Sequence, residues 1–208
     1  MNLSNQAIDL LQDGLNKLNL TLDIEPFIQY ILLLDKWNQA YNLTAVRDKE
    51  TMITRHILDS LAILPWLKGP KILDVGSGAG LPGIPIALAK PDFELVLLDS
   101  NGKKVRFLQE VVRRLKLTQV SVIQSRAESY HPSFVFDTVT SRAFSDLSQM
   151  LQWTNHLLGT HGVWLAMKGR YPETELLHLN KPYRVNQYTV PGLDSERCAV
   201  IIENVTKE

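Results

Sequence analysis

Residues 71–83, which read KILDVGSGAGLPG, decide the fold of this chain. The largely apolar run at 72–75 has the length and type of a buried strand. Three alternating glycines follow it, and residues without a Cβ allow positive φ and let the backbone pass close to a ligand. Pro82 has no N–H and a fixed φ, which suits the first turn of a helix. The stretch therefore predicts a strand, a glycine turn and a helix that ends near Pro91.

The spacing of the glycines indicates which ligand the turn takes. Dinucleotide-binding turns read G-x-G-x-x-G, and their third glycine lets helix and strand pack closely under a pyrophosphate. Leu81 stands where that third glycine would be, and the chain has no G-x-x-x-x-G-K-[ST] loop to cradle a phosphate. The turn therefore favours a cofactor with an adenosine and no phosphate, for which S-adenosylmethionine is the candidate. A tight turn without a ligand is the alternative.

Composition excludes several classes of protein. The 208 residues are 45% hydrophobic and carry a net charge of zero, so no global field draws the protein onto nucleic acid. The single cysteine, Cys198, excludes a disulfide framework within the chain and favours a reducing compartment. Asp9 and Asp13 lie where a basic leader would be needed, and no apolar run has the length of a membrane span. We expect a cytoplasmic protein that is a monomer and does not contact a membrane.

The order of the predicted elements gives the fold class. Amphipathic helices are expected at 4–18, from Asp23 to Tyr41 and from Asp48 to Leu64, so residues 1–68 are predicted to form a helical cap. Residues 69–208 are predicted to form the main domain, as one structural unit with the cap. Strands are expected at 71–75, 94–99, 120–124, 136–140, 162–167, 183–190 and 197–205, with helices at 102–116 and 145–158. Seven strands, the last pair antiparallel, predict an α/β, Rossmann-like class I methyltransferase fold.

Ligands of open α/β sheets bind beyond the carboxyl ends of the strands. Asp99 ends the second strand, about twenty residues after the turn, where an acid accepts hydrogen bonds from ribose hydroxyls. A solvated carboxylate that caps the next helix is the alternative, although Asn101 offers another cap. After the third strand, Ala127 lets the backbone approach an adenine edge, and Glu128 offers an acceptor for its amine. Glu128 as an N-cap of a short helix stays an equal alternative.

The loops after the fourth and fifth strands are expected to hold the methyl acceptor, with Arg142 and Lys168 as candidates. The run Ser141–Phe144 differs from the Asn/Asp-Pro-Pro-aromatic run of amine methyltransferases, and Cys198 lies in the wrong place for a pyrimidine-activating nucleophile. Lys168 lacks an evident carboxylate partner that would help it act as a base on a ribose hydroxyl. A ring nitrogen with a free lone pair needs only alignment with the methyl group. We therefore assign no catalytic base and expect no metal.

Basic residues cluster locally despite the zero net charge. Candidates for RNA contact are Arg55, His56, Lys168 and Arg170, which flank the cap or follow a strand. His56 on an apolar face is more often a hydrogen-bonded core histidine. The basic residues of helix 102–116 are equally well explained as a solvated helix face.

These residues closely resemble those of the RsmG (GidB) family, the bacterial small-subunit ribosomal RNA guanine-N7 methyltransferases. The resemblance covers nearly the whole chain, and its most specific parts are Leu81–Pro85 and Arg55–Ser60. The other matching blocks are Lys36–Asn38, Tyr41–Thr44, Asp74–Gly80, Leu98–Ser100, Lys104–Leu108, Ser141–Phe144 and Lys168-Gly169.

The resemblance implies a fold, a reaction and a set of cofactor contacts. It implies methyl transfer from S-adenosylmethionine to N7 of a guanine in 16S ribosomal RNA, with the small ribosomal subunit as partner. It implies cofactor contacts at Gly76, Leu81, Ala127, Glu128 and Arg142, to which the turn and the strand end add Gly78 and Asp99. A small-molecule methyltransferase with the cap as lid, and a cofactor-binding scaffold without turnover, are the alternatives.

Overall fold

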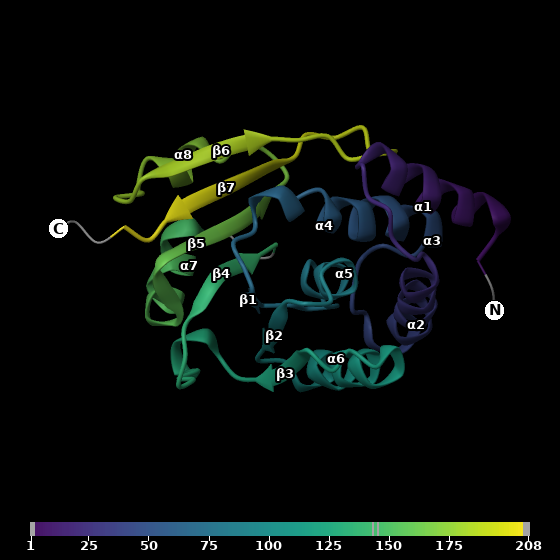
Figure 1. Ribbon diagram of the computed structural model, residues 1–208, viewed down its shortest axis with the longest axis horizontal. Coiled ribbons are helices and arrows are strands. Elements are labelled where there is room, and N and C mark those ends of the chain that lie inside the picture. Colours follow the sequence, from purple (N-terminus) through teal and green to yellow (C-terminus); the bar gives the residue numbers. More distant parts are fainter. Residues whose placement is uncertain (1–2, 143, 145, 206–208) are drawn as a thin grey trace.

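The computed structural model describes residues 3–142, 144 and 146–205, which form a central sheet with helices on both faces (Figure 1). The strands are β1 (Lys71–Val75), β2 (Glu94–Asp99), β3 (Val120–Gln124), β4 (Phe136–Ser141), β5 (Leu158–Lys168), β6 (Tyr183–Gln187) and β7 (Cys198–Glu203). Their order is β3-β2-β1-β4-β5-β7-β6. All neighbours are parallel except β7, which runs antiparallel to both β5 and β6. The order of strands reverses between β1 and β4, where such sheets bind ligands.

The described helices vary widely in length. They are α1 (Asn5–Lys17), α2 (Glu25–Tyr41), α3 (Lys49–Met52), α4 (Asp59–Leu61), α5 (Gly83–Ala89), α6 (Gly102–Leu115), α7 (Leu147–Thr154) and α8 (Glu173–Leu176). A π-helical segment, η1 (Ile53–Leu58), joins α3 to α4. Three 3₁₀ turns are η2 (Leu64–Trp66), η3 (Ala127–Ser129) and η4 (Asn155–Leu157).

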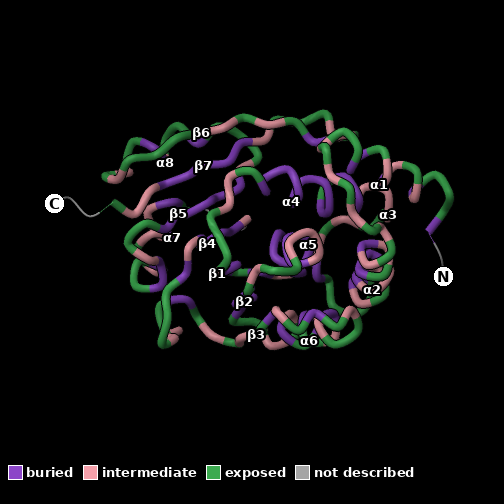
Figure 2. Tube along the Cα trace, in the orientation of Figure 1, coloured by how far each residue is buried: buried purple, intermediate pink, exposed green. Residues whose placement is uncertain are grey.

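Alternate side chains of the strands point to opposite faces, so the sheet separates two apolar cores. In β1, Ile72 belongs to the core shared with the N-terminal helices, α5 and α6, whereas Leu73 and Val75 belong to the core under α7. Figure 2 shows the inner strands largely buried, whereas the edge strand β6 and the outer faces of the helices are largely exposed. Burial on both faces explains why inner strands such as β1 and β2 read as nearly continuous apolar runs in the sequence, unlike the edge strands β3 and β6.

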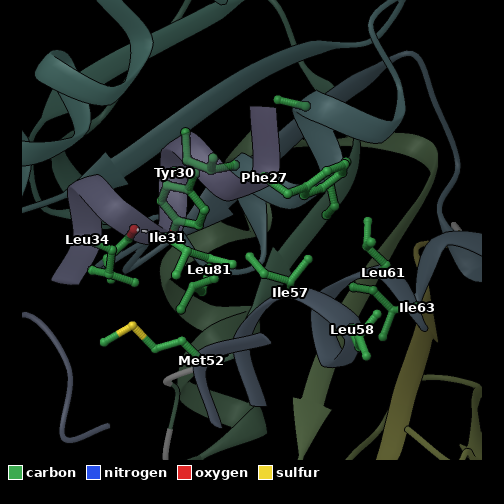
Figure 3. Packing of buried hydrophobic residues seen from close by; sticks show 14 of the residues in the cluster. Phe27, Tyr30, Ile31, Leu34, Met52, Ile57, Leu58, Leu61, Ile63 and Leu81 are labelled. Carbon is green, nitrogen blue, oxygen red and sulfur yellow. Dashed lines mark hydrogen bonds between the residues drawn. The ribbon is translucent and has the colours of Figure 1, made fainter. Parts of the chain in front are cut away.

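The N-terminal helices begin at the expected caps. The Ser4 hydroxyl accepts a hydrogen bond from the Ala7 N–H at 3.1 Å, and the Asp48 carboxylate accepts one from the Thr51 N–H at 2.7 Å. Apolar side chains of these helices pack in one core with Leu81 of the glycine turn (Figure 3). The division into a cap at 1–68 and a domain at 69–208 stays a prediction.

Several predicted boundaries need correction. The helix expected from Asp48 to Leu64 is interrupted by η1, because an apolar stripe does not distinguish π from α geometry. β5 begins at Leu158, four residues before the expected start, next to a register irregularity between β4 and β5. α7 ends at Thr154, and the expected start of this helix at Ser145 lies outside the described residues. β6 ends at Gln187, three residues early. The short helix α8 was not expected.

Tyr30 connects α2 to the glycine turn through a side-chain hydrogen bond. Its side chain is fully buried, and its hydroxyl donates a 2.7 Å hydrogen bond to the carbonyl oxygen of Ala79. Tyr30→Phe should leave that buried carbonyl without its donor and lower the free energy of unfolding by about 1–3 kcal/mol. Urea unfolding of both proteins measures this difference. A matched Tyr183→Phe change removes the hydroxyl of an exposed tyrosine and should leave the midpoint unchanged. An unchanged midpoint for Tyr30→Phe would contradict the assigned role.

Candidate functional site

A first cavity of about 240 Å³ lies at the carboxyl ends of β1, β2 and β3. It is lined by Val75, Gly76, Leu98, Asp99, Ser100, Ser125, Arg126, Ala127, Glu128, Phe144 and Trp153. The rings of Phe144 and Trp153 meet edge to face at 5.8 Å and give the cavity an aromatic wall. Apolar walls with a few convergent polar groups are typical of a small-molecule site.

The glycines of the turn serve different purposes. Gly76, with φ of 68°, lines the first cavity, and a Cβ added there would meet no atom within 4 Å. Gly80, with φ of 92°, has no such space, because a Cβ there would lie 2.6 Å from a side-chain carbon of Ile84. Gly76 is therefore the position where backbone can approach a ligand, and Gly80 is needed for packing.

Asp99 holds the turn against the end of β2. One carboxylate oxygen accepts a 2.9 Å hydrogen bond from the Gly78 N–H, and the other accepts a 2.8 Å bond from the Asn101 N–H. Asn101 caps α6, so Asp99 is not the cap of that helix. Only 6% of Asp99 is exposed, and each of its oxygens keeps a lone pair for a further donor.

Asp74 lies beneath the turn and is fully buried. One of its oxygens accepts a 3.0 Å hydrogen bond from the Gly83 N–H at the start of α5. The other oxygen has no hydrogen-bond partner among the described residues. Burial raises the pKa of Asp74 to about 7, because a charged carboxylate loses its hydration there.

The residues after β3 line the far wall of the first cavity. Ala127 is buried, and the side chain of Glu128 is 39% exposed. The N-cap position of η3 is Arg126, which makes no capping hydrogen bond with its side chain. Glu128 is therefore not an N-cap; one of its carboxylate oxygens lies 3.9 Å from the exposed Arg126 guanidinium, in a loose ion pair at the edge of the cavity.

A second cavity of about 260 Å³ lies at the carboxyl ends of β4 and β5, against η1. It is lined by Val46, Arg55, His56, Asp59, Arg142, Met167, Lys168, Gly169 and Arg197. The loop after β4 connects the two cavities, because Arg142 lines the second and Phe144 lines the first.

Arg142 contacts a carbonyl oxygen that the π-helical geometry leaves free. In an α-helix the Asp59 N–H would bond to the Arg55 carbonyl, but here it bonds to the carbonyl oxygens of Thr54 and His56. The Arg142 guanidinium donates a 3.0 Å hydrogen bond to the Arg55 carbonyl oxygen instead. Arg142 was expected to contact the cofactor, but it does not line the first cavity. Two further expected contacts also lie outside that lining: the Gly78 N–H donates to Asp99, and Leu81 packs in the core.

His56 is a buried neutral base. Its Nδ1 lies 3.4 Å from the Arg142 guanidinium, which can only donate, so Nε2 carries the proton and donates to the Thr44 hydroxyl at 2.9 Å. Burial, aided by Arg142, lowers the pKa of His56 to about 4. A neutral side chain that is 3% exposed is a poor phosphate contact. The structure favours the core role over RNA contact, which stays an untested prediction for His56.

Lys168 requires a correction, because it does have a carboxylate partner. Its ammonium group donates to both carboxylate oxygens of Glu175, at 2.7 and 2.9 Å, and to the Phe144 carbonyl oxygen at 3.0 Å. Glu175 lies on α8, which the sequence pattern did not predict. Lys168 therefore stabilises the loop between the cavities, whereas Arg55 and Arg170 are exposed.

A family model described as GidB, rRNA small subunit methyltransferase G, matches residues 23–199. The chain belongs to the GidB family.

Relatives that carry the name ribosomal RNA small subunit methyltransferase G are similar to this chain over nearly its whole length. The ribosomal RNA small subunit methyltransferase G of Legionella pneumophila strain Philadelphia 1 is 57% identical over 199 residues, which span 96% of this chain and 96% of that protein. The enzyme of the same name from Coxiella burnetii strain RSA 331 is 48% identical over 197 residues, covering 93% and 97%. The resemblance found in the sequence is confirmed.

Solved structures with low identity share the fold of this GidB-family chain. A SAM dependent methyltransferase from Aquifex aeolicus has a TM-score of 0.57 at 17% identity, over 74% of this chain and 93% of that one. A precorrin-6y C5,15-methyltransferase from Geobacter metallireducens has a TM-score of 0.56 at 14% identity, over 79% and 92%. With the strand order, these likenesses confirm the predicted class I methyltransferase fold.

Sequence reasoning missed a buried network beside the second cavity of this GidB-family protein. One carboxylate oxygen of Asp59 accepts a hydrogen bond from the Tyr188 hydroxyl at 3.1 Å and forms an ion pair with Arg197, whose Nε lies 3.3 Å away. Asp59 belongs to the block Arg55–Ser60, on which the family resemblance rests. The sequence contains no signal that pairs Asp59 with Tyr188 or Arg197, which lie more than a hundred positions away.

The low pKa of His56 predicts a pH dependence of stability. As pH falls from 6.5 to about 4, unfolded His56 takes up a proton that the folded protein refuses. The stability of the wild type relative to His56→Gln should therefore fall by about 3 kcal/mol over this window. Comparing the two proteins removes the contribution of Asp74, whose raised pKa acts in the opposite direction. Urea unfolding at several pH values measures the difference, with His178→Gln, at an exposed site, as control. A pH-independent difference would contradict a buried neutral His56.

Proposed function

We propose that this protein transfers a methyl group from S-adenosylmethionine to N7 of a guanine in 16S ribosomal RNA. The observation that carries the proposal is the pair of cavities on either side of the loop after β4. One has the features of an adenosine site, and the other is lined by three arginines, of which Arg55 is exposed. Membership of the GidB family supports ribosomal RNA over a small-molecule acceptor, and supports turnover over a scaffold role.

The first cavity is assigned to the adenosine of the cofactor. We propose that Asp99 accepts hydrogen bonds from the ribose hydroxyls, and that Ala127 and Glu128 contact the adenine. The open space over Gly76 leaves room for the ligand, and Gly78 and Leu81 act by shaping the turn. Arg142 offers a positive charge for the methionine carboxylate. When bound, S-adenosylmethionine supplies an electrophilic methyl group on a sulfonium.

The second cavity suits an acceptor that needs no base. Among the described residues that line it, Lys168 is ion-paired with Glu175, His56 has a pKa of about 4, and Asp59 is bonded to Arg197. None of these is a strong free base for a hydroxyl or an amine. Guanine N7 carries a lone pair in the neutral base, so proximity and orientation can supply most of the rate.

The RNA must present the target guanine outside a regular helix. N7 faces the major groove, which is too deep and narrow in A-form RNA for protein side chains. The guanine therefore lies in a loop or is swung out into the second cavity. Arg55 and Arg170 are exposed next to residues that line this cavity, where phosphates of the same strand would pass.

Removing these two charges should weaken binding in a salt-dependent way. The Arg55→Ala/Arg170→Ala protein should show a slope of log affinity against log salt that is shallower by about 1.5 than wild type. Filter binding of small-subunit ribosomal RNA at several salt concentrations measures the slope. Arg113→Ala/Arg114→Ala on α6 is the matched control, because it also removes two positive charges. The opposite result would contradict the proposed interface. An unchanged slope for Arg55→Ala/Arg170→Ala, with a shallower slope for Arg113→Ala/Arg114→Ala, would indicate that RNA binds at α6.

Tritium-labelled S-adenosylmethionine and small subunits from cells that lack the modification test the proposal. Label in the RNA, followed by borohydride and aniline cleavage at a single guanosine, is the expected result. Label in no RNA, or at a position other than N7, would contradict it.

We propose that the protein acts as a monomer on ribosomal particles in the cytoplasm. No helix in the described part of the chain is long and apolar enough to cross a membrane.

A further inference from the structure

Asp59 is the one acidic side chain among the described residues that line the second cavity. Only 5% of it is exposed, and one carboxylate oxygen accepts the hydrogen bond from Tyr188 and forms the ion pair with Arg197. No described residue donates a hydrogen bond to the other oxygen, Oδ2. Oδ2 is not fully enclosed by protein atoms, so a ligand in the second cavity can donate hydrogen bonds to it.

The chemistry of this oxygen selects among the bases. Guanine presents two adjacent donors, N1–H and the N2 amino group, on its Watson–Crick edge. Adenine has an acceptor at N1, and would place a lone pair against the carboxylate. Oδ2 keeps two lone pairs and can accept from both guanine donors at once, and flipped bases are commonly read on this edge. The opposite edge of the purine, which carries N7, then stays free to react.

The rest of the second cavity complements a guanine. Arginine side chains are the usual donors to guanine O6, and Arg55 and Arg197 line the cavity in addition to Arg142, which is assigned to the cofactor. Val46 and Met167 add apolar surface for the faces of the ring.

We propose that Asp59 selects the target base by accepting hydrogen bonds from N1–H and the N2 amino group of guanine. This inference rests on the proposed function and adds the residue that gives it base specificity. The alternative is a purely structural role, in which Asp59 only neutralises the charge of Arg197 and does not contact the base.

Inosine separates the two roles, because it lacks the N2 amino group and keeps N7. The substrates are small-subunit ribosomal RNAs that carry guanosine or inosine at the position mapped with the wild-type enzyme. Wild type should methylate the inosine RNA with kcat/KM about 10- to 100-fold lower than the guanosine RNA. Asp59→Asn should lose at least about 10-fold on guanosine and treat the two RNAs alike, because Arg197 holds the amide oxygen and the amide NH2, a donor, then faces the base.

Tyr188→Phe is the matched control. It removes one hydrogen bond to Asp59 without changing the lining of the second cavity, and should keep the preference for guanosine. Calorimetric affinity for S-adenosylmethionine should be the same in all three proteins. If Asp59→Asn melts at the assay temperature, Asp59→Asn/Arg197→Gln removes both charges of the pair and should show the same loss of preference.

The outcomes distinguish the inference from the proposed function. Equal rates of wild type on guanosine and inosine RNA would overturn the role of Asp59 and leave the N7 reaction standing. A preference for guanosine that survives in Asp59→Asn would also overturn it. Absence of any label at guanine N7 with wild type would overturn both.

Discussion

Gly76→Asp should abolish measurable binding of S-adenosylmethionine, with an affinity at least about 100-fold below wild type. Gly76 lies at the carboxyl end of β1 with open space above its Cα, and this space is part of the first cavity. A side chain there would occupy the volume assigned to the ligand. Aspartate is among the residues that tolerate positive φ best, so the variant is expected to fold. Isothermal titration calorimetry measures the affinity.

Gly192→Asp is the control for backbone strain. Gly192 also has positive φ, at 76°, lies between β6 and β7, and lines neither cavity. This variant should lose some stability and bind the cofactor as wild type does. Wild-type affinity in Gly76→Asp would contradict the placement of the cofactor.

Asp99→Asn should lower the affinity for S-adenosylmethionine by about 10- to 100-fold. The Asp99 carboxylate accepts from the N–H groups of Gly78 and Asn101, and its remaining lone pairs are assigned to ribose hydroxyls. An amide nitrogen in place of either oxygen cannot accept a hydrogen bond. Its N–H groups would face the N–H group of Gly78 or of Asn101, and two facing donors repel. The variant thereby loses a contact in the turn and an acceptor for the ligand.

Asp137→Asn is the matched control for this change. The Asp137 carboxylate accepts a 2.8 Å hydrogen bond from the Lys71 N–H, at the other end of β1. Both variants lose a carboxylate that holds a backbone N–H, but only Asp99 lines the first cavity. Titration calorimetry should therefore detect weaker binding in Asp99→Asn alone. Equal losses in the two variants would show that affinity depends on general stability.

Local sequence patterns were enough to predict the sheet and the first cavity. Apolar runs predicted the inner strands such as β1, β2 and β7, because these are buried on both faces, whereas the edge strands β3 and β6 are partly exposed and show a weaker pattern. Gly76 and Asp99 were predicted as neighbours because parallel strands bring their carboxyl ends to one edge of the sheet. The structure places both in the lining of the same cavity.

The second cavity was harder to predict, because contacts between distant segments form it. The π-helical segment leaves the Arg55 carbonyl free for Arg142, and the apolar stripe contains no sign of that geometry. Lys168 pairs with Glu175 on a helix of four residues, which is too short to show periodicity. The bond between Asp59 and Arg197 joins residues from opposite ends of the chain, and a single sequence does not reveal such pairs.

The most direct test of the account is a crystal structure with S-adenosylhomocysteine, the product left after methyl transfer. We expect the adenosine in the first cavity, with its ribose hydroxyls at Asp99 and its sulfur directed towards the second cavity across the loop after β4. A cofactor bound elsewhere on the protein, or a sulfur directed away from the second cavity, would contradict the account.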